Sequence, residues 1–300
     1  MSGVDEIELN AYRASPGGVY RSESVTVRRR QVVDQRRLSI ARTEHFDIGR
    51  VGTGLLLEHD LSPDMVSDDI SGQLSTELFD AGWIRGPRLF EELLVGIVLT
   101  SAETPQQAWL NFYRNTIRRI DEEIARPTGR GSIAAYAPVH AHVGQVVRGR
   151  SVHELGTCFG FQALRLARAG LELTASDLSA GSVHLLRDMS ELLDLPVTTQ
   201  VSDAARITVP DASCDTVLAI HLLEHVPDET AVEIIREACR VARHRVVVAV
   251  PFEDEPAQQF GHLRSLGLDD LRGWARAAAT EWPWQVYEHH GGWLLLDRPD

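Results

Sequence analysis

Lysine is absent from this 300-residue sequence, and all 30 of its basic residues are arginine. A chain without lysine cannot form a lysine Schiff base with a carbonyl substrate, anchor pyridoxal phosphate or supply the lysine of a P-loop. These classes of enzyme are therefore excluded.

Cysteine is scarce as well, with only Cys158, Cys214 and Cys239. The number is odd and no pair has C-x-x-C spacing, so neither a disulfide framework nor a zinc ribbon is indicated. No apolar run approaches the roughly 20 residues that span a bilayer. The first ten residues, MSGVDEIELN, are acidic and lack the basic-then-apolar pattern of a signal peptide. We expect a reduced, cytoplasmic protein without membrane insertion.

Positive charge is also in deficit, because the formal net charge is −13. A protein that grips a nucleic-acid backbone needs a basic face, so a nucleic-acid partner is not expected. The run Arg28 to Arg30 is the clearest basic cluster, and such runs are more often a solvated strand edge than an anion site. The hydrophobic content of 43% is ordinary for a globular protein.

The stretch from Val152 to Asp177 predicts a strand, a glycine turn, a helix and a second strand. Glu154 precedes the turn, which runs from Gly156 to Gly160. Such a turn lets backbone N–H groups and a helix N-terminus approach an electron-rich ligand. Asp177 ends the second strand about 20 residues past the glycines, where a carboxylate can accept a ribose hydroxyl. The pattern indicates a nucleoside-binding βαβ unit, and its alternative is an ordinary tight turn of an α/β protein.

The spacing of the turn is E-x-G-x-C-x-G rather than the dinucleotide pattern G-x-G-x-x-G. It resembles the first motif of class I S-adenosylmethionine (SAM)-dependent methyltransferases, E/D-x-G-x-G-x-G, with Cys158 at the middle glycine. In that family the glycines pack against the methionine end of SAM, and the acidic residue after the second strand holds the ribose. The resemblance implies a methyltransferase with SAM as its cofactor.

Four later segments follow in the order that this family shows. They are a helix after Asp177 that Ser179 caps, a third strand ending at Asp203-Ala204, a fourth strand at 217–220 followed by HLLEHVPD, and a fifth strand at 246–250 with a terminal hairpin around Gly291-Gly292. The resemblance implies an α/β domain over residues 131–300, with a Rossmann-like seven-stranded sheet and helices on both faces. An N-terminal α+β extension over residues 1–130 would precede it.

The resemblance also implies that the cofactor contacts lie at the strand ends. We assign them to Glu154, Gly156, Thr157, Cys158, Gly160, Asp177, Leu178, Asp203, Ala204 and His221. In this family the acidic residue after the third strand reaches toward the adenine amino group. The alternative role for Asp203 is that of an exposed loop aspartate.

Removing a proton from an acceptor hydroxyl requires a base at the end of the fourth strand. The segment from Asp215 to Asp228 matches the family's D-x-x-x-x-x-x-x-L-E-H-x-x-D pattern. His225 is the best candidate because imidazole has a near-neutral pKa, and Glu224 lies beside it in the sequence. We assign both as catalytic residues.

A divalent metal ion is a second interpretation of the same residues. The H-x-x-E-H spacing of His221, Glu224 and His225 can put three ligands around one turn, and His262 can supply a fourth. Related methyltransferases that act on ribose or quinol hydroxyls carry E-x-x-E-H and a later histidine, which bind a divalent cation. His221 stands where they have glutamate, and imidazole favours softer metals than Mg²⁺. The alternative is that Glu224-His225 caps the loop without metal.

The first 130 residues carry no recognised catalytic motif. Alternating apolar residues predict strands up to about residue 60, and apolar residues three and four apart predict amphipathic helices from Gly72 onward. Trp109, Phe112 and Tyr113 are interpreted as core, with a ring-binding pocket as the alternative. PTGRGS at residues 127–132 breaks the pattern. We interpret residues 1–130 as an acceptor-binding or lid region.

The acceptor is suggested only by a narrower resemblance. GWIRGPRLFEELLVGIVLTS, QAWLNFYRNT and HELGTCFGFQALRLA resemble the mycofactocin oligosaccharide methyltransferase family, from about Leu74 to the end of the chain. This implies O-methylation of a glucose hydroxyl in the oligoglucosyl chain of a peptide-derived redox cofactor, hence a glycan or other small-molecule partner. The alternatives are a methyltransferase of a quinone precursor, lipid or other natural product, and, more distantly, an NAD(P)-dependent oxidoreductase or a non-catalytic SAM-binding module.

Overall fold

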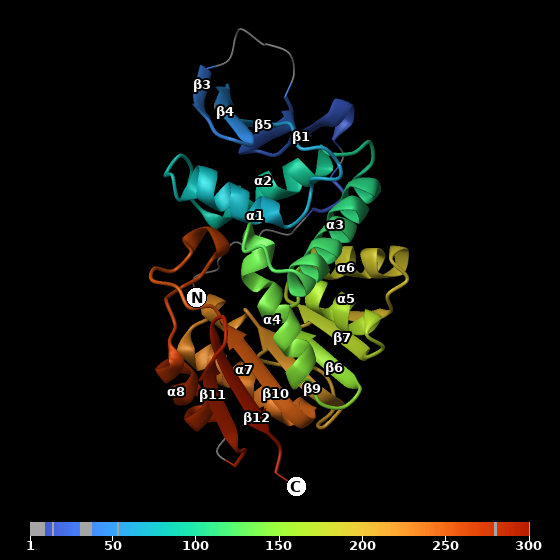
Figure 1. Cartoon of the computed structure of the whole chain (residues 1–300), viewed down its shortest axis with the longest axis vertical. Helices are drawn as coiled ribbons and strands as arrows, with labels where there is room; N and C mark the ends of the chain where they lie inside the picture. Colours follow the sequence, from blue (N-terminus) through green and yellow to red (C-terminus); the bar gives the residue numbers. More distant parts are fainter. Residues whose placement is uncertain (1–9, 14, 31–37, 53, 279–280, 300) are drawn as a thin grey trace. The chain divides into compact units, whose positions relative to one another are not determined.

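The computed structural model describes most of the chain in two compact units (Figure 1). The described residues are 10–13, 15–30, 38–52, 54–278 and 281–299. The prediction that rests on the acidic N-terminus concerns residues 1–9, which lie outside them. One unit comprises Asn10–Ala135 with Gln258–Phe260, and the other comprises Tyr136–Ala257 with Gly261–Asp300. Packing therefore divides the chain slightly after the boundary at residue 130 that the sequence predicts.

The N-terminal unit combines a five-stranded sheet with helices. The sheet order is β1-β2-β5-β4-β3, in which β2 and β5 are parallel and the other neighbours are antiparallel. The elements are η1 (Pro16–Gly18), β1 (Val19–Arg21), β2 (Val25–Arg29), β3 (Leu38–Arg42), β4 (Phe46–Val51), β5 (Gly54–His59), α1 (Asp69–Leu74), the π-helical turn η2 (Ser75–Phe79), α2 (Pro87–Leu99), α3 (Pro105–Ala125) and η4 (Gln258–Phe260).

The aromatic cluster of α3 belongs to the core of this unit. Trp109, Phe112 and Tyr113 are all fully buried, and the Trp109 indole N–H donates to the Ala11 carbonyl at 2.6 Å. These buried rings belong to the hydrophobic core of the unit, as the core interpretation predicts. Thr104 caps α3 by accepting a hydrogen bond from the Gln107 N–H at 3.2 Å.

Two arginines of the run Arg28 to Arg30 form ion pairs within the N-terminal unit. The Arg28 guanidinium lies 2.9 Å from the Glu58 carboxylate, and Arg30 forms an ion pair with Asp60. The interpretation of the run as a strand edge is wrong, because β2 lies between β1 and β5 in the sheet. Since Arg28 and Arg30 have carboxylate partners, they do not form an open anion site.

The C-terminal unit is built on the seven-stranded sheet that the sequence predicts. Its order is β11-β12-β10-β9-β6-β7-β8, with β12 antiparallel to both neighbours and the other pairs parallel. The elements are α4 (Ser132–Val146), which begins in the N-terminal unit, β6 (Ser151–Leu155), α5 (Phe161–Arg168), β7 (Glu172–Asp177), α6 (Ala180–Leu192), β8 (Val197–Val201), β9 (Cys214–Ile220), η3 (Leu223–His225), α7 (Asp228–Val241), β10 (Ala242–Val250), α8 (Leu268–Ala278), β11 (Trp284–Glu288) and β12 (Gly292–Asp297).

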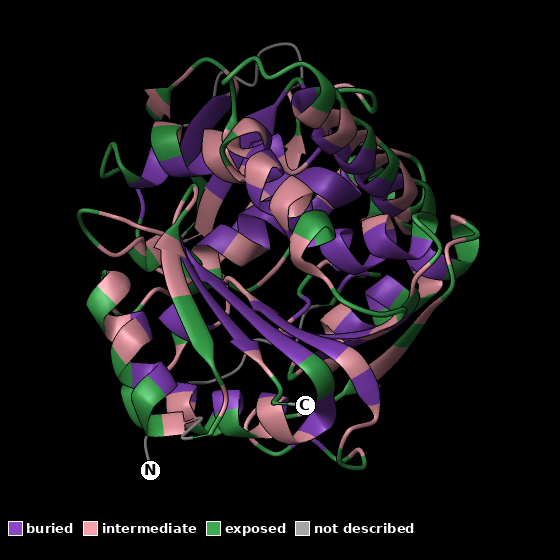
Figure 2. Ribbon diagram, turned by 60° about the horizontal axis from the view of Figure 1, so that its bottom comes forward, coloured by how far each residue is buried: buried purple, intermediate pink, exposed green. Residues whose placement is uncertain are grey.

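Helices cover this sheet on both faces. The strand order reverses beside β6, and right-handed crossovers then place α5 and α6 on one face and α7 on the other. The middle strands are buried from both sides, so β9 and β10 contain continuous apolar runs (Figure 2). Against them pack α7 and α8, through residues such as Ile235 and Trp274. The fold is therefore α/β, as predicted, with α8 as a helix that the sequence analysis did not include.

No helix among the described residues is long and apolar enough to cross a membrane.

The N-cap of α6 that the sequence predicts is present, because the Ser179 hydroxyl accepts a hydrogen bond from the Ser182 N–H at 3.2 Å. This cap directs the chain away from the sheet edge immediately after Asp177, which leaves that edge accessible.

Candidate active site at the carboxyl edge of the sheet

The predicted site residues gather where the strand order reverses. In a parallel sheet the crevice for ligands lies outside the carboxyl ends of the strands at this switch point. Here the switch point lies between β6 and β9, with β7 on the other side of β6. The glycine turn, Asp177 and the segment after Ile220 leave these three strand ends.

The turn after β6 has the backbone geometry of a close-approach site. Gly156, Cys158 and Gly160 all have positive φ values, of 64°, 50° and 72°. A Cβ at Gly156 would lie 2.5 Å from Leu222 Cδ1, so only glycine fits at this position. Cys158 adopts a left-handed conformation that strains an L-residue, and its side chain is exposed.

Glu154 and Thr157 hold this turn from below. Glu154 is 5% exposed, and its carboxylate accepts a hydrogen bond from the Thr157 hydroxyl at 2.9 Å. The Thr157 N–H donates to the Ser176 carbonyl at 3.0 Å. Burial raises the pKa of Glu154 to about 7. The structure thus places both residues beneath the turn, where they determine its shape.

Asp177 faces the turn across the sheet edge. One of its carboxylate oxygens accepts the Cys158 N–H at 2.8 Å, and the other accepts the Ser179 N–H at 2.9 Å. A carboxylate can accept about four hydrogen bonds, so each oxygen retains capacity for a ligand hydroxyl. The next residue, Leu178, is 54% exposed, so it presents an apolar surface beside this carboxylate. A fixed acceptor beside an apolar surface suits a ribose joined to a base.

Asp203 and Ala204 follow β8 at the same edge. Asp203 is exposed, and its side chain accepts the Ala205 N–H at 2.9 Å, which closes a local turn. Ala204 is partly buried against the core of β9 and β10. Asp203 is therefore exposed where a ligand can reach it. Its role in closing the local turn is the alternative reason for an aspartate at this position.

His221 directly follows β9 in a left-handed conformation, with φ of 52°. Its N–H donates to the Ala249 carbonyl at 2.8 Å, which continues the pairing with β10. Its side-chain Nε2 is enclosed and has no hydrogen-bond partner among the residues that the structure describes. Burial lowers the pKa of His221 to about 4, and neighbouring His262 and His225 add to this effect.

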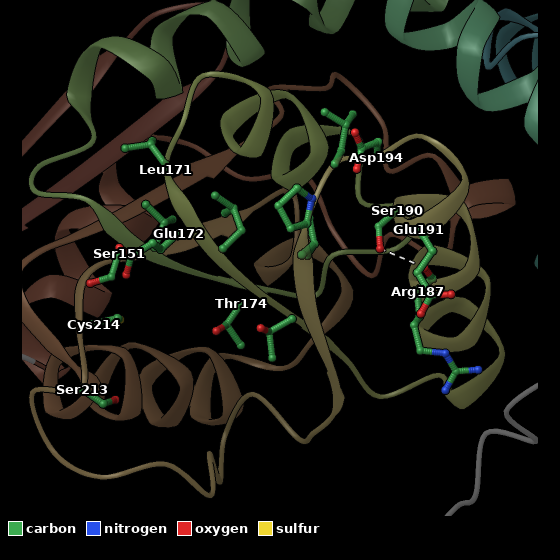
Figure 3. Close-up of a pocket in the computed structure, with 16 residues that line it drawn as sticks. Ser151, Leu171, Glu172, Thr174, Arg187, Ser190, Glu191, Asp194, Ser213 and Cys214 are labelled. Atoms are coloured by element: carbon green, nitrogen blue, oxygen red, sulfur yellow. Dashed lines mark hydrogen bonds between the residues drawn. The ribbon is translucent and has the colours of Figure 1, made fainter.

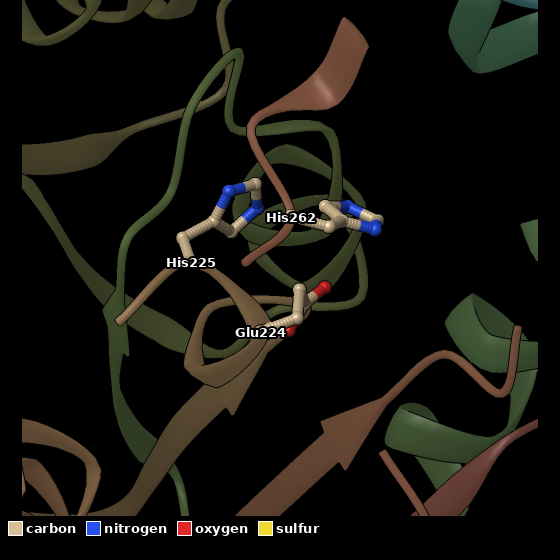
Figure 4. Close-up of side chains that lie close together, drawn as sticks. All are labelled: Glu224, His225 and His262. Atoms are coloured by element: carbon tan, nitrogen blue, oxygen red, sulfur yellow. The ribbon is translucent and has the colours of Figure 1, made fainter. Parts of the chain in front are cut away.

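Three of the four predicted metal ligands come together at this edge (Figure 4). One ligand atom from each of Glu224, His225 and His262 lies within 4.8 Å of the other two. The two imidazole rings meet edge to face with centroids 4.9 Å apart. His221 lies outside this group, so the predicted set of four reduces to three.

Glu224 is the most exceptional polar group of the site. It is 1% exposed, and neither of its carboxylate oxygens accepts a hydrogen bond from any residue in the described part of the chain. Burial raises its pKa to about 8, and burial lowers that of His225 to about 4. A buried carboxylate is normally paired, because desolvating a charge is costly. The cluster is thus suited to receive a cation or a hydrogen-bond donor.

One residue of this site was not predicted from the sequence. Glu253, in the loop after β10, accepts a hydrogen bond from His262 Nδ1 at 2.8 Å and another from the Ala257 N–H at 3.2 Å. The acidic run Glu253-Asp254-Glu255 directly after a buried strand was the available signal, because strand ends carry the ligands in such sheets.

A groove at the opposite edge of the sheet contains none of the predicted residues (Figure 3). It has a volume of about 830 Å³ and is lined by the first residues of β6, β7, β8 and β9 together with the end of α6. Ligands of open α/β sheets bind at carboxyl rather than amino ends of strands, so we do not assign the cofactor here.

Comparison with known proteins identifies the domain to which this sheet edge belongs. A family model described as a methyltransferase domain matches residues 153–250, from β6 to the end of β10. Residues 153–250 thus carry a methyltransferase domain. The match covers the glycine turn, Asp177 and the segment of His221 to His225, and it ends before His262.

One curated relative is the 27-O-demethylrifamycin SV methyltransferase of Amycolatopsis mediterranei (strain S699). It is 31% identical over 127 residues, which are 41% of this chain and 43% of the relative. The chain therefore spans less than half the length of this relative.

Two solved structures are similar at low identity. A SAM-dependent methyltransferase from Aquifex aeolicus gives a TM-score of 0.45 with 15% identity, covering 60% of this chain and 96% of that chain. Magnesium protoporphyrin IX methyltransferase from Synechocystis PCC 6803, solved with bound S-adenosylhomocysteine, gives 0.42 with 18% identity, covering 64% and 87%.

Proposed function

We propose that this chain is a SAM-dependent O-methyltransferase that methylates a sugar hydroxyl of an oligosaccharide, of the mycofactocin-type oligoglucoside class. The observation that carries the proposal is the buried, unpartnered Glu224 beside His225 and His262, on the same sheet edge as the glycine turn and Asp177. Such an edge combines a nucleoside site with groups that can activate a hydroxyl.

The residues of the turn fit SAM. The turn leads into the N-terminus of α5, Asp177 offers fixed acceptors for ribose hydroxyls, and Leu178 offers an apolar surface for a base. When bound, SAM supplies a methyl group on a positively charged sulfur, and attack by an acceptor oxygen forms the C–O bond as the C–S bond breaks. The remaining task of the protein is to orient that oxygen and remove its proton.

Two assignments of the proton transfer follow from the cluster. In a metal-free enzyme His225 is the base, although the lowering of its pKa to about 4 makes the neutral imidazole a weaker proton acceptor at pH 7 than an ordinary histidine. In a metal-dependent enzyme Glu224, His225 and His262 hold a divalent cation that lowers the pKa of a bound hydroxyl. We favour the second assignment, because the unpartnered Glu224 carboxylate fits a cation, and the two-imidazole, one-carboxylate set suits a transition ion better than Mg²⁺.

We assign acceptor selectivity to the N-terminal unit, in agreement with the acceptor-binding or lid role for residues 1–130. It carries an open groove of about 860 Å³, lined by planar polar side chains and one aromatic ring. Among the lining residues are Glu44, Asp64, Gln73, Arg118, Arg130 and Phe260. Phe260 is 37% exposed, and the Gln73 side-chain oxygen is buried with no hydrogen-bond partner among the described residues. Carboxylate, guanidinium and amide groups beside an exposed ring suit a polyhydroxylated acceptor.

A natural-product acceptor is the second candidate. The observation in its favour is the 31% identity to an enzyme named for methylating a demethylrifamycin. That match covers 41% of this chain, so it bears on the shared methyltransferase core more than on the acceptor.

An acceptor panel tests the proposal. Purified protein, treated with a chelator and then supplied with SAM, is incubated with an oligoglucoside, a quinol and a polyketide hydroxyl, with and without added divalent metal. We expect a 14-Da increment on the oligoglucoside, quenched by chelator. An increment only on the quinol or the polyketide overturns the glycan assignment. Binding of NAD in place of S-adenosylhomocysteine, or SAM binding without turnover on any extract, overturns the methyltransferase assignment.

A further inference from the structure

The loop that follows β10 is tied to the candidate cluster at two points. His262 Nδ1 lies 2.8 Å from a Glu253 carboxylate oxygen, and the Leu263 N–H donates to the Glu224 carbonyl at 3.0 Å. The Glu253 side chain is 24% exposed and the His262 side chain 9%, so their contact is largely shielded from water. Glu253 also accepts the Ala257 N–H, which orients its carboxylate.

This contact determines which ring nitrogen of His262 carries the proton. A carboxylate is only an acceptor, so the neutral imidazole must place its hydrogen on Nδ1 to satisfy the contact. The lone pair of the ring then resides on Nε2. His262 is thus held with a defined lone pair, which is the arrangement a ligand or a base requires.

We propose that Glu253 is a positioning residue, whose carboxylate holds His262 as the Nδ1–H tautomer so that Nε2 serves the cluster as the electron-pair donor. The inference deepens the proposed function, because it rests on the cluster of Glu224, His225 and His262 as the hydroxyl-activating site. Partners of this kind raise the basicity of a metal-ligating histidine and orient its ring, and their loss typically weakens metal affinity by about 10- to 100-fold.

The substitution Glu253→Ala removes the restraint. The same oxygen, Oε2, accepts the Ala257 N–H and faces His262 Nδ1, so a glutamine oxygen in its place could still accept both hydrogens. Alanine leaves the Nδ1 hydrogen of His262 without this acceptor, so the Nδ1–H tautomer is no longer favoured. Glu255→Ala is the matched control, because Glu255 is an exposed carboxylate in the same loop.

The test reads the tautomer and the metal affinity separately. ¹⁵N NMR of the chelator-treated protein identifies the His262 ring signals by their loss in His262→Ala. We expect the Nδ1–H tautomer in the wild type and in Glu255→Ala, and a loss of the preference for Nδ1–H in Glu253→Ala. Calorimetry with Zn²⁺ alone should show about 10- to 100-fold weaker binding in Glu253→Ala, and no further loss when Glu253→Ala is added to His262→Ala. Binding of S-adenosylhomocysteine should stay unchanged, which shows that the variant is folded.

The outcomes are distinguishable. An unchanged tautomer in Glu253→Ala overturns the inference, whatever the metal does. An equal loss of Zn²⁺ affinity from Glu253→Ala in the presence and absence of His262 also overturns it, since Glu253 would then act through the loop. A tautomer change in a protein whose wild type binds no Zn²⁺ supports the positioning role and overturns the metal assignment of the proposed function.

Discussion

Two regions on one sheet edge treat their polar groups in opposite ways. In the glycine turn every acidic group has a partner: Glu154 accepts from Thr157, and Asp177 accepts from Cys158 and Ser179. In the cluster after β9, Glu224 has both oxygens buried without a hydrogen bond from any described residue. We call the glycine turn with Asp177 the complete region, because its carboxylates already have hydrogen-bond partners. We call the cluster of Glu224, His225 and His262 the incomplete region, because the Glu224 carboxylate gains a partner only when the cluster binds a ligand. We infer that the turn is preorganised for the cofactor and that the cluster is held open for the reacting groups.

The largest effect should come from removing the acceptor in the complete region. Asp177→Ala loses the ribose acceptor and also releases the Cys158 and Ser179 N–H groups, so the turn loses its shape together with its ligand. We expect affinity for S-adenosylhomocysteine to fall by more than about 100-fold, since hydrogen bonds to a charged group contribute about 1.5–3 kcal/mol each. Calorimetry measures this change.

The control for that substitution lies on the same strand. Glu172→Ala removes an exposed carboxylate from the first residue of β7, whereas Asp177 is the last. Its affinity for S-adenosylhomocysteine should equal that of the wild type. Unchanged affinity in Asp177→Ala would show that the cofactor does not bind in this crevice, and the role assigned to the complete region would be wrong.

A smaller effect, confined to turnover, should come from the incomplete region. His225→Ala removes the base or a metal ligand while leaving the glycine turn intact. We expect kcat to fall by roughly 100-fold, within the range of general acid–base catalysis, with unchanged affinity for S-adenosylhomocysteine. Steady-state kinetics with labelled SAM measures it. Full activity would exclude His225 both as base and as ligand, and a parallel loss of cofactor affinity would show that the two regions are not independent.

The complete region could be predicted from the sequence because its interactions are local. The turn from Gly156 to Gly160 and the carboxylate at Asp177 belong to one βαβ unit, and their pattern determines strand, turn and helix. The seven-stranded sheet followed from the family resemblance, and the structure confirms it. The helix α8 was missed because its short amphipathic pattern is interrupted by Gly273 and lies in a segment without a motif.

The incomplete region depends on contacts that spacing does not show. The set of four ligands assumed one helical turn over residues 221–225, but only Leu223–His225 forms a turn, and His221 leaves the strand in a left-handed conformation. The bond from His262 to Glu253 joins the two ends of a loop, and the burial of Glu224 comes from tertiary packing. These features arise only when the chain is folded.

The smallest effect should appear in stability rather than activity, and it measures how incomplete the cluster is. Burial raises the folded-state pKa of Glu224 to about 8, above its ordinary value of 4.5, so the folded state binds this proton more tightly than the unfolded state does. The contribution of this proton to the stability of the folded state is fully present below about pH 4.5 and is lost as the pH rises through 8.

In chelator, Glu224→Gln should therefore gain stability over the wild type as the pH rises from 5 to 9, by several degrees in Tm, while the exposed Glu172→Gln should not. Added Zn²⁺ at pH 8 should stabilise the wild type and leave Glu224→Gln unchanged. A difference in Tm that does not vary with pH would mean that Glu224 is already paired in solution, and the contrast between the two regions would then disappear.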